Sequence, residues 1–304
     1  MNLALTVLNI TAPVFLLAAI GFAWVRLGFE YRVQFVTRLA MTLAVPCLIF
    51  VALMRTEVAP EALAALSLAS LVAYALVMAA CFIVVKLWRL DVATYLAPLA
   101  FGNTGNLGLP LALFAFGEVG LGYAVVVFAV MAILSFTIGI YIVSGGGSLI
   151  RLVQEPLVAA TLLGALFLWQ GWETPDFLTN ALDLIGQMAI PLMLITLGVA
   201  VARLETRAMK RAVFLSLIKV VICVGAGWMT ARWFELEPVA AAVLIVQVAT
   251  PVAVTSYLLA EKYGADAQPV AGLVVASTLL SVIALPLILA FAIDPVSLGF
   301  PDRP

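Results

Sequence analysis

Long apolar runs, separated by short polar or Gly/Pro-marked breaks, dominate the sequence. A helix that spans a bilayer needs about 20 mostly apolar residues, and stretches of this kind recur along the whole chain. The predicted helices cover residues 5–26, 34–54, 62–86, 92–116, 119–143, 155–171, 178–202, 209–232, 238–260 and 266–293. Two of them are interrupted, the fourth by residues 102–110 and the ninth by residues 249–251. The pattern predicts an all-α membrane protein of ten transmembrane helices.

The two halves of the chain repeat the same glycines and prolines in the same order. The matching pairs, displaced by 143 to 147 residues, are Pro13 and Pro156, Gly21 and Gly164, Gly28 and Gly171, Pro46 and Pro191, and Gly117 and Gly264. Each repeat would hold five helices, and an odd number forces the halves into opposite orientations, as in the inverted repeats of secondary transporters. We predict a first repeat over 1–144, a cytoplasmic linker over 145–154, a second repeat over 155–293 and an exterior tail over 294–304.

The basic residues set the orientation, because cytoplasmic loops carry an excess of Lys and Arg. With the N-terminus outside, the inside loops hold Arg26, Arg32, Arg38, Lys86, Arg89, Arg151, Arg203, Arg207, Lys210, Arg211 and Lys262. The outside then carries Arg55, Arg232 and Arg303. This asymmetry predicts a multi-pass protein of the cytoplasmic (inner) membrane with both termini exterior.

The composition limits the classes of function. Hydrophobic residues make up 65% of the 304 residues and charged residues 10%, whereas a soluble surface is about 25–35% charged. The net charge of −1 argues against nucleic-acid binding, which calls for a basic patch. The chain has no histidine, the commonest metal ligand and a frequent general base. We therefore expect no enzyme, no cofactor and no metal site.

The paired interruptions of the fourth and ninth helices are the candidate substrate site. Such breaks at corresponding positions of two repeats are the best sequence indication of a transporter's binding site. The freed N–H groups at the start of each second half carry roughly +0.5 charge, so two facing ends can bind an anion. The free carbonyl groups of the first halves offer a cation site as the alternative. The candidate substrate-binding residues are Asn103, Thr104, Gly105, Asn106, Thr250 and Pro251.

Two further polar residues lie inside apolar runs. Lys219 would either extend toward the cytoplasmic interface or face the substrate cavity. Gln247 either belongs to the site or bridges neighbouring helices. The competing interpretation of the two breaks is that they only kink helices for packing, since Gly and Pro are tolerated in membrane helices.

The stretches GNTGNLGLPLALFAFG (Gly102–Gly117) and ATPVAVTSYLLAEKYG (Ala249–Gly264) resemble the auxin efflux carrier family of plants and bacteria. The resemblance extends over nearly the whole chain. It implies an inverted-repeat fold related to bile-acid symporters, in which helices 1, 2, 6 and 7 form a scaffold. Helices 3–5 and 8–10 would form a transport part that moves past this scaffold, as in an elevator-type transporter.

The same resemblance assigns roles to individual residues. Asn103 matches the family's asparagine beside the substrate carboxylate, and Pro110 and Pro251 match the prolines of the two crossing helices. Ser256 stands where plant members have a further proline, which puts the second crossover geometry in doubt. The long cytoplasmic loop of the plant members is reduced here to roughly ten residues, and bacterial relatives are often described as malonate or malate permeases.

The sequence thus predicts a secondary transporter that moves a small organic anion, a carboxylate, by alternating access. Its expected partners are that anion, a coupling proton or sodium ion, and the lipid bilayer; a homodimer is the candidate assembly. The alternatives are a sodium-coupled organic-anion symporter of the bile-acid type and a non-transporting membrane sensor.

Overall fold

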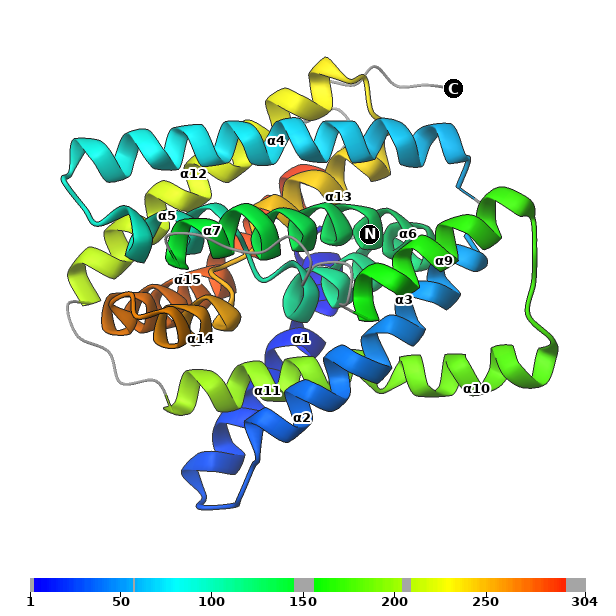
Figure 1. The fold of residues 1–304 in the computed structure, drawn as a ribbon, viewed down its shortest axis with the longest axis horizontal. Helices are drawn as coiled ribbons and strands as arrows, with labels where there is room; N and C mark the ends of the chain where they lie inside the picture. The colour runs from blue at the N-terminus through cyan, green and yellow to red at the C-terminus, as the bar shows by residue number, and fades with distance from the viewer. Residues whose placement is uncertain (1–2, 57, 145–155, 204–208, 294–304) are drawn as a thin grey trace.

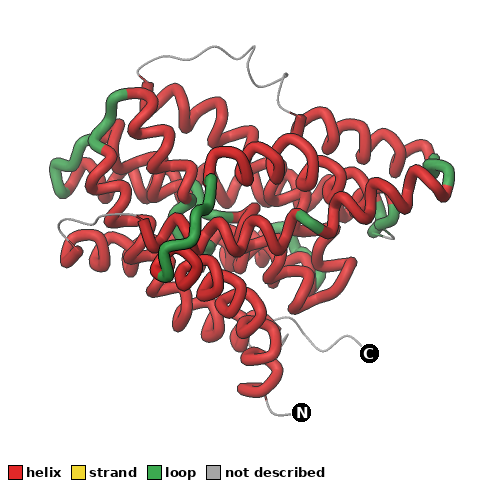
Figure 2. The backbone as a smooth tube through the Cα atoms, turned by 90° about the horizontal axis from the view of Figure 1, so that it is seen from below, coloured by secondary structure: helices red, strands yellow, loops and turns green. Residues whose placement is uncertain are grey.

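The computed structural model describes residues 3–56, 58–144, 156–203 and 209–293, so the predicted linker and exterior tail lie outside the described residues. Within the described ranges the chain is helical, and Figure 2 shows no strand there. The first half comprises α1 (Leu3–Arg26), α2 (Val33–Leu39), η1 (Ala40–Ala44), α3 (Val45–Met54), α4 (Pro60–Leu87), α5 (Val92–Ala100), η2 (Thr104–Gly108), α6 (Leu109–Leu134), η3 (Ser135–Gly139) and α7 (Ile140–Ser144). The second comprises α9 (Pro156–Gln170), α10 (Asp176–Gln187), α11 (Ala189–Arg203), α12 (Met209–Trp233), α13 (Pro238–Val248), α14 (Val254–Tyr263) and α15 (Ala267–Ile293). The all-α prediction is confirmed for these residues.

Seven helical segments in the described part of the chain are long and apolar enough to cross a membrane. They are Val7–Arg26, Val33–Met54, Glu61–Leu87, Thr104–Ser144, Asp176–Arg203, Met209–Trp233 and Ala267–Ala292. The other predicted ranges also contain helix, in shorter pieces such as α9 and α13. Large apolar side chains on these helices are exposed, Leu87 and Val221 among them. A solvent of lipid accounts for that exposure, because a soluble monomer rarely exposes wide apolar patches.

The helices pack into two groups. In one, α1 lies along α11, and α3 packs on α9 and α10 (Figure 1). In the other, α4 and α12 pack on each other and on α5, α6, α13 and α15. The groups meet where α11 contacts η2 and where α6 contacts α1 and α3.

A proline distorts one long helical run in each half. Pro46 follows the π-helix η1, and Pro191 follows the break between α10 and α11 at Met188. Proline lacks the N–H group that would bond the carbonyl four residues earlier. The carbonyl groups of Thr42 and Gln187 therefore lose their helical donors at equivalent places in the two halves.

Two of the repeated glycine pairs share a positive φ. Gly28, Gly117, Gly171 and Gly264 all have positive φ, between 64° and 84°. Gly117 has φ 65° and ψ −156°, which kinks α6 at the place where the sequence predicted a boundary between two helices. A side chain would strain this backbone, whereas glycine adopts it readily.

Small residues let the helices of the first group approach closely. Gly21 of α1 lies against the backbone of Ile195 in α11, and Gly164 of α9 lies against Phe50 and Leu53 in α3. Gly21 and Gly164 are a repeat pair, and Phe50 precedes Ile195 by the same 145 residues that separate Pro46 from Pro191. Each half therefore packs on the other through equivalent contacts.

We predict that Gly198→Ala destabilises the fold, because the added methyl group would collide with the backbone of Ala18 in α1. Overpacking of this kind costs about 1–3 kcal/mol. The matched control is Gly225→Ala in α12, where nothing lies within 4 Å of the added carbon and helix propensity favours Ala by about 1 kcal/mol. Thermal unfolding in detergent, followed by tryptophan fluorescence, should give a lower midpoint for Gly198→Ala alone. Equal midpoints would contradict the packing described here.

Candidate functional site

The segments that follow α5 and α13 meet each other. α5 ends at Ala100, α13 ends at Val248, and the extended residues beyond them form an antiparallel bridge between Gly102 and Val252. The N–H group of Asn103 donates to the carbonyl oxygen of Pro251 at 2.7 Å. The backbone that each helix leaves unpaired is thus partly satisfied by the other. We call this contact, formed by residues 102–108 and 247–252, the crossing.

Two glycines permit the close approach at the crossing. A β-carbon at Gly102 would lie 2.9 Å from the carbonyl oxygen of Thr250. A β-carbon at Gly108 would collide with the side-chain amide of Gln247. Neither contact leaves room for a side chain, so glycine is required by the approach itself.

Side chains complete the hydrogen bonding around the crossing. The Thr250 hydroxyl donates to the Gln247 carbonyl oxygen at 2.7 Å, and the Val252 N–H group donates to Ser277 Oγ of α15 at 2.9 Å. Gln247 Nε2 donates to the carbonyl oxygen of Ala124 in α6 at 3.3 Å. Gln247 therefore links α13 to α6 and also lies at the crossing.

Three polar side-chain atoms at the crossing are buried without a hydrogen-bond partner among the described residues: Asn103 Nδ2, Thr104 Oγ1 and Gln247 Oε1. The three residues are 4%, 0% and 0% exposed. A buried polar atom left unpaired costs about 1–3 kcal/mol, and such atoms are rare in native proteins. In addition, the first N–H groups of η2 have no acceptor within their own helix. The crossing thus holds two unused side-chain donors, Asn103 Nδ2 and Thr104 Oγ1, which a bound anion or water can satisfy, and one unused acceptor, Gln247 Oε1.

The other predicted residues lie in or beside η2 and the second break. Gly105 is buried, with Phe128 Cε2 3.0 Å from the place of a β-carbon, whereas Asn106 is partly exposed. Pro110 is buried in the first turn of α6, and Pro251 is buried at the bridge.

Lys219 does not belong to the crossing by any hydrogen bond in the described part of the chain. Its side chain is 1% exposed, and Nζ donates to Cys223 Sγ at 3.5 Å, one turn further along α12. Its head group is packed inside the bundle, and both predicted roles of this lysine stay predictions.

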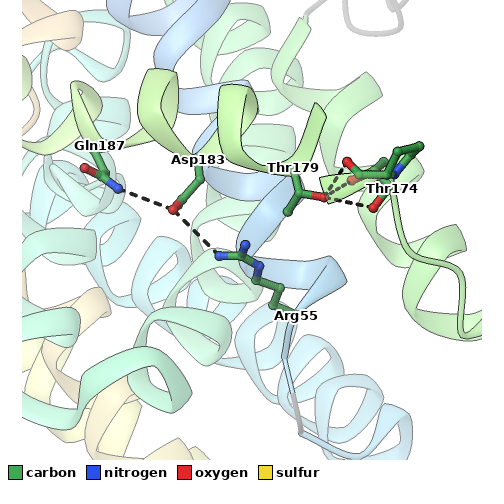
Figure 3. Close-up of polar contacts among 6 residues, drawn as sticks. Arg55, Thr174, Thr179, Asp183 and Gln187 are labelled. Carbon is green, nitrogen blue, oxygen red and sulfur yellow. Dashed lines mark hydrogen bonds and ion pairs between the residues drawn. The ribbon is translucent and has the colours of Figure 1, made fainter. Parts of the chain in front are cut away.

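A cavity of about 740 Å³ lies between the two groups of helices, where α3, α6, α10 and α11 meet. We call it the Arg55 cavity. Its polar lining residues are Arg55, Thr56, Glu118, Asp183 and Gln187. Arg55 Nη1 lies 3.7 Å from Asp183 Oδ2, to which Gln187 Nε2 donates at 3.3 Å (Figure 3).

Sequence reasoning treated Arg55 only as a loop charge and gave Asp183 no role. The signal that could have found them is a carboxylate inside an otherwise apolar run, followed four residues later by a glutamine. Residues spaced in this way share one helix face.

A second cavity, of about 660 Å³, lies at the opposite end of the same helical runs. It is lined by residues 30–35, by the end of α11 and by α14, and we call it the Tyr31 cavity. There the Tyr31 hydroxyl is 2.7 Å from Thr196 Oγ1, and Arg203 Nη2 donates to the Tyr31 carbonyl oxygen at 2.7 Å. The two cavities therefore approach the interface between the groups from opposite ends.

Comparison with known proteins gives two similarities. The sequence model of a family described as membrane transport protein matches residues 6–148 and residues 144–289. The chain is also similar to an uncharacterized transporter of Methanocaldococcus jannaschii, with 26% identity over 200 residues. That alignment covers 61% of this chain and 64% of the relative.

We predict that Ser277→Ala loosens the crossing, because the buried Val252 N–H group would lose its acceptor. The expected loss is about 1–3 kcal/mol. The matched control is Ser67→Ala in α4, whose hydroxyl only donates back to the Leu63 carbonyl oxygen of the same helix. Thermal unfolding in detergent should separate the two variants, and a Ser277→Ala midpoint equal to that of Ser67→Ala would contradict the assignment.

Proposed function

The chain belongs to the membrane transport protein family, and we propose that it is a secondary transporter for a small organic anion with a carboxylate group. In this proposal the anion binds at the crossing and moves across the cytoplasmic membrane by alternating access. The similarity to an uncharacterized transporter of Methanocaldococcus jannaschii supports the class of activity. Family membership also favours a transporter over an enzyme.

The observation that carries the proposal is the set of unpaired polar atoms at the crossing. Asn103 Nδ2 and Thr104 Oγ1 are donors that sit at the start of η2. The N-terminal end of a helix carries roughly +0.5 charge, and its N–H groups favour an anion. A carboxylate would use these donors without any buried basic side chain.

The grouping of the helices supports the alternating-access part of the proposal. We propose the ten-helix, inverted-repeat plan, with α1, α2, α3, α9, α10 and α11 as the scaffold. The second group would carry the crossing past the scaffold. The Arg55 and Tyr31 cavities lie at opposite ends of that interface, so each would serve as the access route from one face.

The membrane potential limits the direction of uncoupled transport. A potential of 100 mV is worth about 2.3 kcal/mol per elementary charge. With a negative interior, a monoanion would therefore leave the cell without any coupling ion, whereas uptake of a dianion would need a co-transported proton or sodium ion. Flux into liposomes under an imposed potential, with and without sodium, distinguishes a uniporter from a sodium-coupled symporter. Binding without flux would instead indicate a membrane sensor.

We predict that Asn103→Ala weakens carboxylate binding while the protein remains folded. The lost hydrogen bond to a charged group is worth about 1.5–3 kcal/mol, or roughly a ten- to hundred-fold rise in Kd. The measurement is a thermal-shift titration of purified protein with acetate, malonate, malate and succinate, with and without sodium. The matched control is Asn180→Ala, an exposed asparagine of α10, which should bind as the wild type does. Wild-type affinity in Asn103→Ala would remove this residue from the site.

A further inference from the structure

The guanidinium group of Arg55, which lines the Arg55 cavity, has only one weak partner. Arg55 caps the C-terminal end of α3, and its Nη1 atom lies 3.7 Å from Asp183 Oδ2. Charge-assisted hydrogen bonds are shorter, about 2.7–2.9 Å. The two side chains are 51% and 40% exposed, and ion pairs so open to solvent contribute little to stability. Within the described residues, the guanidinium group has no other hydrogen bond or ion pair.

Asp183 has a second partner that makes it less dependent on Arg55. Gln187 lies one turn further along α10 and donates to Asp183 Oδ2 from its amide nitrogen at 3.3 Å (Figure 3). Asp183 would keep this hydrogen bond if the guanidinium turned away. The pair can therefore separate without leaving the carboxylate bare.

The wall around the pair suits a small acid. α3 and α6 contribute apolar side chains, among them Val51 and Leu113, and the polar lining residues besides Arg55 are Thr56, Glu118, Asp183 and Gln187. A guanidinium group presents paired N–H donors that match a carboxylate in two-point contact. Such a contact strengthens next to apolar walls, where the effective dielectric constant is lower than in water.

We propose that Arg55 receives the substrate carboxylate on its way to the crossing, and that Asp183 occupies the guanidinium group until the substrate arrives. This inference rests on the proposed function. The substrate carboxylate takes the place of the Asp183 carboxylate beside Arg55, so the positive charge of Arg55 stays compensated throughout. The position of the cavity also fits this order, since α6 continues directly from η2 at the crossing into the cavity wall formed by Leu113 and Phe114.

A purely structural role predicts something different. If the pair only fastened α3 to α10, removing either partner would have the same effect. If Asp183 competes with the substrate, the two removals have opposite effects. Arg55→Gln should raise KM for entry from the Arg55 side, and Asp183→Asn should lower it.

The test is uptake of radiolabelled malonate into membrane vesicles of the two orientations, prepared from cells that express the full chain. Arg55→Gln is expected to raise KM roughly ten-fold or more in vesicles that expose Arg55 to the medium, and to leave KM unchanged in the opposite orientation. Asp183→Asn is expected to lower KM in the first orientation. The control is Arg38→Gln, an exposed arginine of α2 outside both cavities, which should leave both values unchanged.

The outcomes separate this inference from the proposed function. A KM for Arg55→Gln within about two-fold of wild type, or equal rises for Arg55→Gln and Asp183→Asn, overturns the role of Arg55 while wild-type flux still supports a transporter. Wild-type vesicles that take up no malonate, malate or acetate overturn both. Tryptophan-fluorescence unfolding of each variant shows whether a changed KM comes with a folded protein.

Discussion

A bilayer provides no water to pair with exposed main-chain groups, and this constraint governs the centre of the molecule. Unpaired N–H and C=O groups cost several kcal/mol each in hydrocarbon, so an irregular backbone persists there only when protein surrounds it. Here two irregular segments pair with each other. The bridge between Gly102 and Val252 and the bond from Asn103 to Pro251 satisfy part of the backbone that each helix gives up. The donors that stay unpaired beside the bridge, Asn103 Nδ2 and Thr104 Oγ1, are the proposed ligands of the anion.

The repeat gives this arrangement its symmetry. The glycines with positive φ, the two prolines that disturb long helical runs and the close contacts of Gly21 and Gly164 all occur at matching positions of the two halves. The proposed alternating access needs two equivalent arrangements of the interface, one open toward each end, and equivalent contacts of this kind would support it. The Arg55 and Tyr31 cavities lie at those two ends.

The sequence alone was enough to predict the features that depend on the backbone preferences of single residues. Gly102, Asn103 and Pro251 break apolar runs by their own backbone preferences, so the interruptions could be found without a structure. The partners across the crossing could not, because nothing local says that Gly108 faces Gln247 or that Ser277 accepts from Val252. The position of Lys219 deep in an apolar run shows that placing its charge there is costly. The sequence does not show which face of α12 carries this side chain. The pairing of Arg55 with Asp183 could not be predicted for the same reason, since α3 and α10 meet only in the folded chain.

The most direct measurement of the central claim is a cryo-electron microscopy map of the purified protein with malonate bound. The account predicts ligand density at the crossing, with carboxylate oxygens within hydrogen-bond distance of Asn103 Nδ2 and Thr104 Oγ1. Density confined to another part of the molecule, or a fourth helix that continues unbroken through residues 101–108, would contradict it.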